Sequence, residues 1–220
     1  MPDFKVILDI SSPRMVVGRF LATPGELQDW SKRQQRFPER RLNEFSMQRQ
    51  REHCAVDAAM RLFSGPSSQA CIVHDDAGKP LLANSAGSFI SIAHHSDDVG
   101  CLVAVSISDR PIGCDLEVLR PQLHTVAPRF VDEAELQAAR GDIQALCAIW
   151  ATKEAMFKAF GPALDFRADL RVNWSDERTA LLKGITGDVR GKDHAFAAWK
   201  ATANEVHPEF WVVCGPVDGK

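Results

Sequence analysis

The order in which strand and helix patterns follow one another most constrains the fold of this chain. Short apolar or alternating runs predict strands, and apolar residues three or four positions apart predict helices. Strands are expected at residues 5–10, 15–20, 112–117, 170–174, 194–202 and 209–214, and helices at 43–63, 132–140 and 142–160. Residues 71–82 read as a strand followed by a turn, and residues 88–108 as two strands around a polar break. Because the two kinds of element do not alternate regularly, and the last three strands read as an antiparallel meander, we predict the α+β class.

The composition indicates a folded protein without an obvious nucleic-acid or membrane partner. Of the 220 residues, 45% are hydrophobic and 25% charged, which is enough to bury a core. The net charge of -3 gives no overall basic footprint, and no run of about 18 apolar residues is present. Residues 32–51 nevertheless carry seven Lys or Arg. That basic stretch is either a solvated helix face or the rim of an anion-binding site.

Two acidic side chains lie on one face of the strand expected at residues 112–117. The two-residue period of a strand places Asp115 and Glu117 on one side and Ile112, Cys114 and Leu116 on the other. Two carboxylates so close repel each other unless they are solvated or share a cation, and oxygen ligands suit Mg²⁺ or Mn²⁺. The spacing alone leaves both a solvated strand face and a cation site open.

A second group of charged residues lies near the end of the helix expected at 142–160. Glu154 and Lys158 are four residues apart, so they lie on one face of the helix, where they could form a simple surface ion pair. Trp150 and Phe157 are two turns apart and are expected in the core. Taken by itself, this segment is an ordinary amphipathic helix.

Together, the two segments resemble the paired motifs of the 4'-phosphopantetheinyl transferases. I-G-x-D-h-E at residues 112–117 is followed 33 residues later by W-x-x-K-E-A-h-h-K at 150–158. Three further segments match the family in the correct order: Gly78-Lys79-Pro80, Ser91-Ile92-Ala93-His94 and the stretch from Phe130 to Glu135. The resemblance covers roughly residues 45–161, and the length of the chain is similar to the longer, two-halved branch typified by the surfactin synthetase activator.

The resemblance implies a fold and a location for the active site. It predicts two similar α/β halves related by pseudo-two-fold symmetry, each with a small antiparallel sheet packed on a long helix. The halves are expected at residues 1–109 and 110–220, with the active site in the cleft between them. A cytoplasmic monomer is also expected.

The resemblance further assigns roles to single residues. Asp115, Glu117 and Glu154 would hold Mg²⁺, with Mn²⁺ as an alternative, and Glu154, Lys158 and Glu135 would be catalytic. Glu135 would act as a base or hold a water, although its spacing from Asp132 equally fits a helix-capping box. Contacts to coenzyme A are expected from Arg49, Arg51, Lys79, Pro80, His94, Lys153 and Lys158.

One departure from the family pattern concerns the strand end at His94. The family usually has Ser-His-Ser there, whereas this chain has Ala93-His94-His95. A hydroxyl often placed near the nucleotide phosphate is therefore absent. His95 either compensates for it or faces solvent.

The implied reaction is attack by a serine hydroxyl of an apo acyl- or peptidyl-carrier protein on the β-phosphorus of coenzyme A. The carrier gains the 4'-phosphopantetheine arm, and adenosine 3',5'-bisphosphate leaves. Deprotonation of the serine is expected from Glu135 or from Glu154 through a water. The alternatives are a metal-dependent phosphohydrolase of a coenzyme A-like nucleotide and a non-catalytic coenzyme A-binding protein.

Overall fold

The structure is a computed structural model that describes residues 3–63, 69–83, 85, 87–98, 100–202 and 209–217. The chain divides into two compact units, Met1–Arg110 and Pro111–Lys220. Each unit combines helices with an antiparallel sheet, so the mixed α and β composition that the sequence predicts is confirmed. No helix in the described ranges is both long and apolar enough to cross a membrane.

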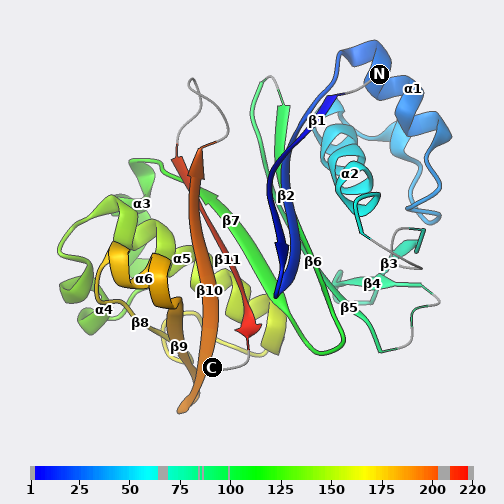
Figure 1. Cartoon of the computed structure of the whole chain (residues 1–220). Helices are drawn as coiled ribbons and strands as arrows, with labels where there is room; N and C mark the ends of the chain where they lie inside the picture. Colours follow the sequence, from blue (N-terminus) through cyan, green and yellow to red (C-terminus); the bar gives the residue numbers. More distant parts are fainter. Residues whose placement is uncertain are drawn as a thin grey trace. The chain divides into compact units, whose positions relative to one another are not determined.

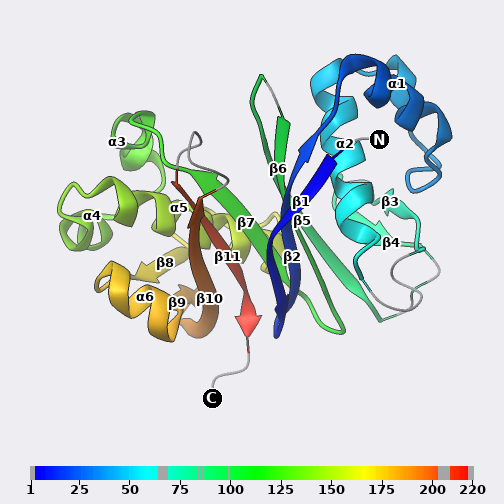
Figure 2. The same cartoon turned by 45° about the horizontal axis from the view of Figure 1, so that its top comes forward.

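The N-terminal unit is a four-stranded antiparallel sheet covered by a helix. Its elements are β1 (Asp3–Ser11), β2 (Arg14–Leu21), α1 (Pro24–Arg33), a 3-10 turn (Leu42–Glu44), α2 (Met47–Met60), β3 (Ile72–His74), β4 (Pro80–Leu82), β5 (Phe89–Ser96) and β6 (Gly100–Ser108). The strand order is β1-β2-β6-β5, and α2 packs on one face of this sheet (Figure 1). Strands β3 and β4 form a separate two-stranded ribbon beside α2 (Figure 2).

Helix α2 lies within the range 43–63 that its spacing predicts. It begins where the Ser46 hydroxyl accepts a hydrogen bond from the Arg49 backbone N–H. Its buried residues, among them Cys54, Ala55 and Ala59, face the core of the unit. Helix α1 was not predicted, although Thr23 and Glu26 form a capping box at its start.

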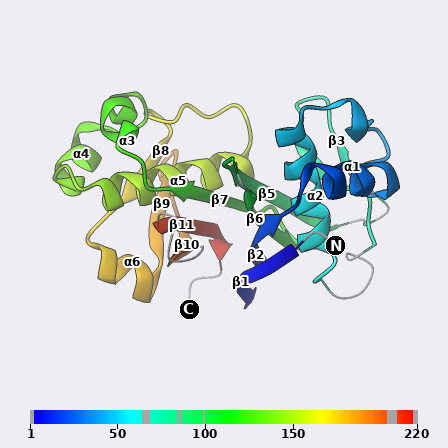
Figure 3. The same ribbon diagram turned by 90° about the horizontal axis from the view of Figure 1, so that it is seen from above.

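The C-terminal unit is a five-stranded antiparallel sheet in the order β7-β11-β10-β9-β8. Its elements are β7 (Gly113–Val118), α3 (Gln122–Val126), a 3-10 turn (Ala127–Arg129), α4 (Glu133–Ala139), α5 (Ile143–Phe160), β8 (Leu170–Asn173), α6 (Glu177–Lys183), β9 (Ile185–Val189), β10 (Lys192–Thr202) and β11 (Glu209–Val217). The long helix α5 lies along β7 and β11 (Figure 3). The predicted antiparallel meander is confirmed, with β9 as an additional strand.

The ends of α5 follow from local sequence. Asp142 caps the first turn by accepting a hydrogen bond from the Gln144 backbone N–H. Beyond Phe160, Gly161 adopts a φ of 108°, a conformation that side-chain-bearing residues rarely reach. Most apolar side chains between these ends are buried, and Trp150 and Phe157, expected in the core, are partly buried against it, so α5 is the central core helix of its unit.

Gly113 allows β7 to approach the backbone of α5 very closely. A Cβ atom at this position would overlap with the carbonyl oxygen of Ala155 and lie 2.9 Å from the backbone nitrogen of Ala159. Neither group is a flexible side-chain end that could move aside. The glycine of the I-G-x-D motif is therefore required by the packing of the strand on the helix.

A buried ion pair joins α5 to α4 and β8. Lys153 is 0% exposed, and its Nζ donates to Glu135 Oε2 at 2.7 Å and to the carbonyl oxygens of Phe130 at 2.6 Å and Phe166 at 2.8 Å. Glu135 also accepts hydrogen bonds from the backbone N–H groups of Asp132 and Val172. The predicted capping box of Asp132 and Glu135 is thus present, and it is neutralised by a lysine from another helix.

Gly113→Ala should destabilise the protein by about 3 kcal/mol, because the added methyl group meets backbone that cannot move without separating β7 from α5. Urea denaturation measures this change. Gly25→Ala is the matched control, since a Cβ there meets nothing within 4 Å. Equal unfolding midpoints for the Gly113→Ala variant and the wild type would contradict the packing constraint.

Lys153→Met should cost about 3–5 kcal/mol, because it leaves the Glu135 carboxylate buried without a countercharge. The double variant Lys153→Met/Glu135→Gln should be more stable than Lys153→Met alone, since it removes both charges together. Lys192→Met, at an exposed position on β10, is the control. If the single and double variants unfolded at the same urea concentration, the ion pair would not be the source of the loss.

Candidate functional site

Three carboxylates and a lysine gather where β7 meets α5. Asp115 and Glu117 alternate with inward neighbours on β7, and Glu154 and Lys158 lie one turn apart on α5. Lys158 Nζ donates to Asp115 Oδ1 at 2.7 Å and to the carbonyl oxygen of Cys114 at 3.0 Å. The close approach at Gly113 sets this short distance between strand and helix.

Burial and neighbouring charges shift the pKa values of these groups. Burial and, after it, the charge of Asp115 raise the pKa of Glu154 to about 6. Burial also raises the pKa of Glu117, although Arg120 opposes this shift. Burial disfavours the ammonium of Lys158, but the charge of Asp115 outweighs that effect, so the pKa of Lys158 is raised. The cluster therefore carries an excess of negative charge that a cation would relieve.

The donor chemistry suits a hard cation, but two of the carboxylates already have basic partners. Asp115 pairs with Lys158, and Glu117 Oε1 accepts a hydrogen bond from Arg120 Nε at 2.7 Å. Within the ranges that the structure describes, no group of three or more His, Cys, Asp or Glu side chains is arranged to hold a metal ion. Mg²⁺ prefers carboxylate oxygens as ligands, so the residue types fit the ion. The side chains of Asp115, Glu117 and Glu154 would have to turn toward it.

Glu135 and Lys153 differ from this cluster in being enclosed by the fold. Both are almost fully buried, and every Nζ hydrogen of Lys153 is used in a hydrogen bond to the protein. The carboxylate oxygens of Glu135 accept from Lys153 and from two backbone N–H groups. The structure gives these two predicted site residues positions inside the fold, with no group free to touch a substrate.

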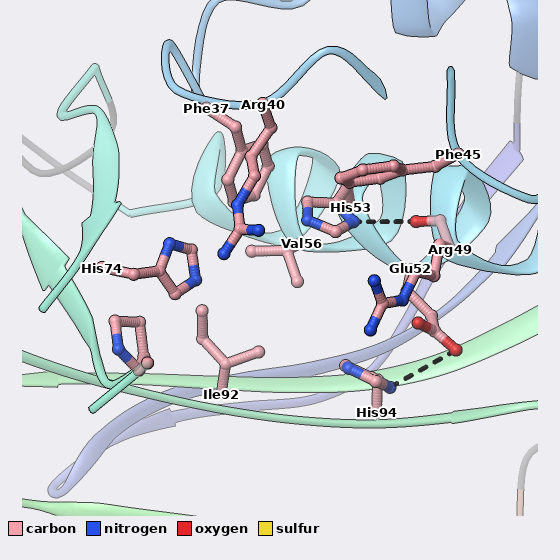
Figure 4. A pocket seen from close by; sticks show the side chains of 12 residues that line it. Phe37, Arg40, Phe45, Arg49, Glu52, His53, Val56, His74, Ile92 and His94 are labelled. Carbon is pink, nitrogen blue, oxygen red and sulfur yellow. Dashed lines mark hydrogen bonds and ion pairs between the residues drawn. The ribbon is translucent and has the colours of Figure 1, made fainter. Parts of the chain in front are cut away.

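A cavity of about 320 Å³ lies in the N-terminal unit, within the size range of small-molecule sites. It is bounded by α2, by the loop that follows α1, by the β3–β4 ribbon and by β5 (Figure 4). Its lining residues are Phe37, Arg40, Phe45, Arg49, Glu52, His53, Val56, His74, Gly78, Pro80, Ile92 and His94. Aromatic rings, arginines and histidines together suit a ligand that has both a flat ring and negative charge.

Local hydrogen bonds fix the side chains of this cavity. The ring of His53 donates through Nδ1–H to the carbonyl oxygen of Arg49, one turn earlier in α2, at 2.8 Å. It packs edge-on against Phe37 at 4.8 Å and beside Phe45 at 5.5 Å. His94 Nδ1 lies 3.8 Å from Glu52 Oε1. Burial lowers the pKa of His53, so that ring is mostly neutral near pH 7.

The turn at Gly78-Lys79-Pro80 closes one end of the cavity. Asp75 Oδ1 accepts hydrogen bonds from the backbone N–H groups of Ala77 and Lys79, and Gly78 adopts a φ of 82°. This left-handed conformation explains why glycine stands first in the motif. The turn thereby sets Gly78 and Pro80 in the cavity wall.

The predicted nucleotide contacts divide into two groups. Arg49, Pro80 and His94 line the cavity, whereas Lys79 and Arg51 do not belong to its lining. Arg51 instead donates through Nη1 to the carbonyl oxygen of Asp97, at the turn after β5. Sequence reasoning missed Phe37, Arg40, His53 and His74. Only the excess of arginine in residues 32–51 pointed toward one of them.

A second hollow of about 480 Å³ adjoins the first in the wall formed by the loop after α1. The two share Phe37 and Arg40, and the second also includes Lys32 and Arg41. The basic stretch is thus more than a helix face, since part of it lines concave surface. Lys32 and Arg41 are nevertheless exposed, so both the anion-binding rim and the solvated face remain open for them.

Comparison with known proteins identifies the C-terminal unit. Residues 111–211 match the family model described as the 4'-phosphopantetheinyl transferase superfamily. Over 97 residues the chain is 29% identical to the 4'-phosphopantetheinyl transferase AcpT of Escherichia coli O157:H7. The aligned region covers 41% of this chain and 48% of that protein. The AcpT of Salmonella typhimurium is 30% identical over 97 residues, with 41% and 49% covered.

The chain spans about half the length of the curated relatives it matches. The matched residues include β7 and α5, and with them Asp115, Glu117, Glu154 and Lys158. The pair of motifs first noticed in the sequence therefore lies within the region that the family model matches. Over residues 111–211 the C-terminal unit is therefore similar to the 4'-phosphopantetheinyl transferase superfamily.

Proposed function

We propose that this protein transfers the 4'-phosphopantetheine arm of coenzyme A to a serine of an apo acyl- or peptidyl-carrier protein and releases adenosine 3',5'-bisphosphate. The observation that carries the proposal is the cluster of Asp115, Glu117, Glu154 and Lys158 inside the region matched by the family model. The relatives from Escherichia coli and Salmonella typhimurium are 4'-phosphopantetheinyl transferases, which supports the same activity for this chain.

The cluster offers carboxylates that could hold a cation and a lysine that is itself a cation, and both suit phosphoryl transfer. Such reactions spread negative charge over phosphate oxygens, so they depend on cations held close to those oxygens. We propose that Asp115, Glu117 and Glu154 hold Mg²⁺, with Mn²⁺ as an alternative; when bound, the ion would polarise the phosphate oxygens. Lys158, with its raised pKa, stays protonated and can turn from Asp115 to the pyrophosphate.

The burial of Glu135 supports Glu154 as the proposed general base. Glu135 has both carboxylate oxygens engaged inside the fold, so it supports the structure of the site and does not reach a serine hydroxyl. Glu154 lies beside Asp115 and Lys158 in the cluster, and without a bound ion its pKa is raised to about 6 by burial and by the charge of Asp115. We propose that Glu154 accepts the serine proton, directly or through a water.

We further propose that the cavity of the N-terminal unit holds the nucleotide portion of coenzyme A. Its size suits the nucleotide better than the whole cofactor, whose pantetheine arm would extend outside. Arg40, Arg49 and His94 supply positive or hydrogen-bonding groups for phosphates. Lys79 lies next to the cavity wall and is kept as a candidate for an outer phosphate contact.

The remaining expectations from the resemblance stay predictions. They are the two-halved branch with pseudo-two-fold related halves, an active site in the cleft between residues 1–109 and 110–220, the monomeric state, the cytoplasmic location and the absence of nucleic-acid and membrane partners. The pathway served by the carrier protein is equally a matter for experiment.

Incubation of an apo carrier protein with coenzyme A, Mg²⁺ and this protein should add one phosphopantetheine to the carrier, as read by intact mass. Asp115→Ala and Glu154→Ala should each slow transfer about 100-fold or more, because each removes a carboxylate that would hold the Mg²⁺ on which the transition state depends. Asp193→Ala, an exposed position on β10, should leave the rate unchanged.

Other outcomes separate the rival functions. Free phosphopantetheine with an unmodified carrier would favour a phosphohydrolase. Binding of coenzyme A without any product would favour a non-catalytic binding protein. Unchanged transfer by the Asp115→Ala and Glu154→Ala variants would remove the carboxylates from the mechanism.

Mg²⁺ affinity should fall as the pH falls through about 6, the pKa of Glu154. The pKa is raised, so a proton competes for this carboxylate at a higher pH than usual, and each further unit of acid should weaken binding about tenfold. Calorimetric titration of Mg²⁺ at several pH values measures this dependence. Glu154→Gln should bind Mg²⁺ more weakly and with a flatter pH profile, whereas a wild-type affinity equal at about pH 5 and pH 7 would contradict the assignment.

A further inference from the structure

Helix α5 holds Glu117 at two points. The Cys147 thiol donates to the carbonyl oxygen of Glu117 at 3.3 Å, and one turn later the side chain of Trp150 forms a hydrogen bond with the Glu117 carboxylate. The indole N–H is the only hydrogen-bond donor of a tryptophan side chain, so the carboxylate accepts this bond. The helix therefore fixes both the backbone and the carboxylate of a residue that we propose as a ligand of Mg²⁺.

Two aromatic rings hold the indole of Trp150 in place. The ring of Phe130 packs edge-on against it with the centroids 4.7 Å apart, and the ring of Phe166 stacks on it at 5.5 Å. Trp150 itself packs against the core of the C-terminal unit. A side chain enclosed in this way has little freedom to turn, so the direction of its N–H is set before any ligand arrives.

The buried ammonium of Lys153 supports both of these rings. Its Nζ donates to the carbonyl oxygens of Phe130 and Phe166, the two residues whose rings flank Trp150. A continuous series of contacts thus leads from the buried lysine through the two rings to Trp150 and on to Glu117. The tryptophan and the lysine of the W-x-x-K-E segment are therefore linked to the carboxylate cluster through the fold.

The second donor to Glu117 is free to move. Arg120 Nε lies 2.7 Å from Glu117 Oε1, but the side chain of Arg120 is 48% exposed. A bound cation would repel this guanidinium, and an exposed side chain can turn into water at little cost. The indole of Trp150 carries no charge, so its bond to Glu117 is compatible with a cation beside the carboxylate.

We infer that Trp150 is a positioning residue of the candidate metal site: its N–H anchors the Glu117 carboxylate while that carboxylate turns from Arg120 to the cation. This rests on the proposed function, in which Glu117 is a ligand of Mg²⁺. Hydrogen-bonding partners of metal ligands contribute about 10- to 100-fold to metal affinity, because they orient the ligand. The two donors to this one carboxylate therefore have opposite effects on the binding of Mg²⁺.

The test measures the Mg²⁺ affinity of the full chain by calorimetry, with the metal alone as the probe. Trp150→Phe keeps an aromatic ring in the same place but removes the N–H, and should weaken Mg²⁺ binding about 10-fold. Arg120→Gln removes the competing charge and should strengthen binding about 2- to 5-fold. Trp174→Phe is the matched control at another partly buried tryptophan and should bind Mg²⁺ as the wild type does.

A double variant separates positioning from packing. If Trp150 acts through Glu117, Trp150→Phe should cause little further loss of Mg²⁺ affinity in a Glu117→Gln background, whereas two independent losses would multiply. The urea unfolding midpoint of Trp150→Phe should also stay close to that of the wild type, because the ring contacts are kept.

The results separate the role of Trp150 from the function on which it rests. Unchanged Mg²⁺ affinity in Trp150→Phe, or losses that multiply in the double variant, would overturn the positioning role and leave the proposed function standing. Weaker binding by Arg120→Gln would contradict the displacement of Arg120. A wild type that bound no Mg²⁺ would overturn both the metal site and the role of Trp150.

Discussion

The close contact between β7 and α5 is the constraint on which the rest of the C-terminal unit depends. Gly113 has no side chain, so the backbone of the strand reaches the backbone of the helix near Ala155. That contact brings Asp115 within hydrogen-bonding distance of Lys158 and places Glu154 where burial and neighbouring charge shift its pKa. The same packing that stabilises the fold therefore also sets the charge environment of the candidate site.

Elements with strong patterns could be predicted from the sequence, and weakly patterned ones could not. Helix α5 has an almost wholly apolar face between two clear end signals, so its bounds were nearly correct. Helix α1 buries only Leu27 and Ser31 and reads as polar sequence, and α6 buries only Ala180. Strand β9 contains Gly187 and Asp188, two residue types that strands disfavour, and it is stabilised by pairing with β8 and β10 and by the burial of Ile185.

The candidate sites show the same limit at the level of single residues. Strand periodicity was sufficient to place Asp115 and Glu117 on one face, but their pairing with the helix came from the family resemblance. The cavity of the N-terminal unit draws residues from four separate segments, and no local pattern links Phe37 to His74 or His53. Such a cavity exists only once the segments pack together, so its aromatic and histidine residues were not foreseen.

The buried ammonium of Lys153 has a consequence for its neighbour on the helix. Successive residues of an α-helix point about 100° apart around its axis, so fixing the direction of one fixes the direction of the next. Lys153 is held by three oxygens from other segments, and α5 can neither turn nor slide without breaking these bonds. The buried charge of Lys153 therefore fixes the rotation of α5 about its axis, and the direction in which the Glu154 carboxylate points depends on that rotation.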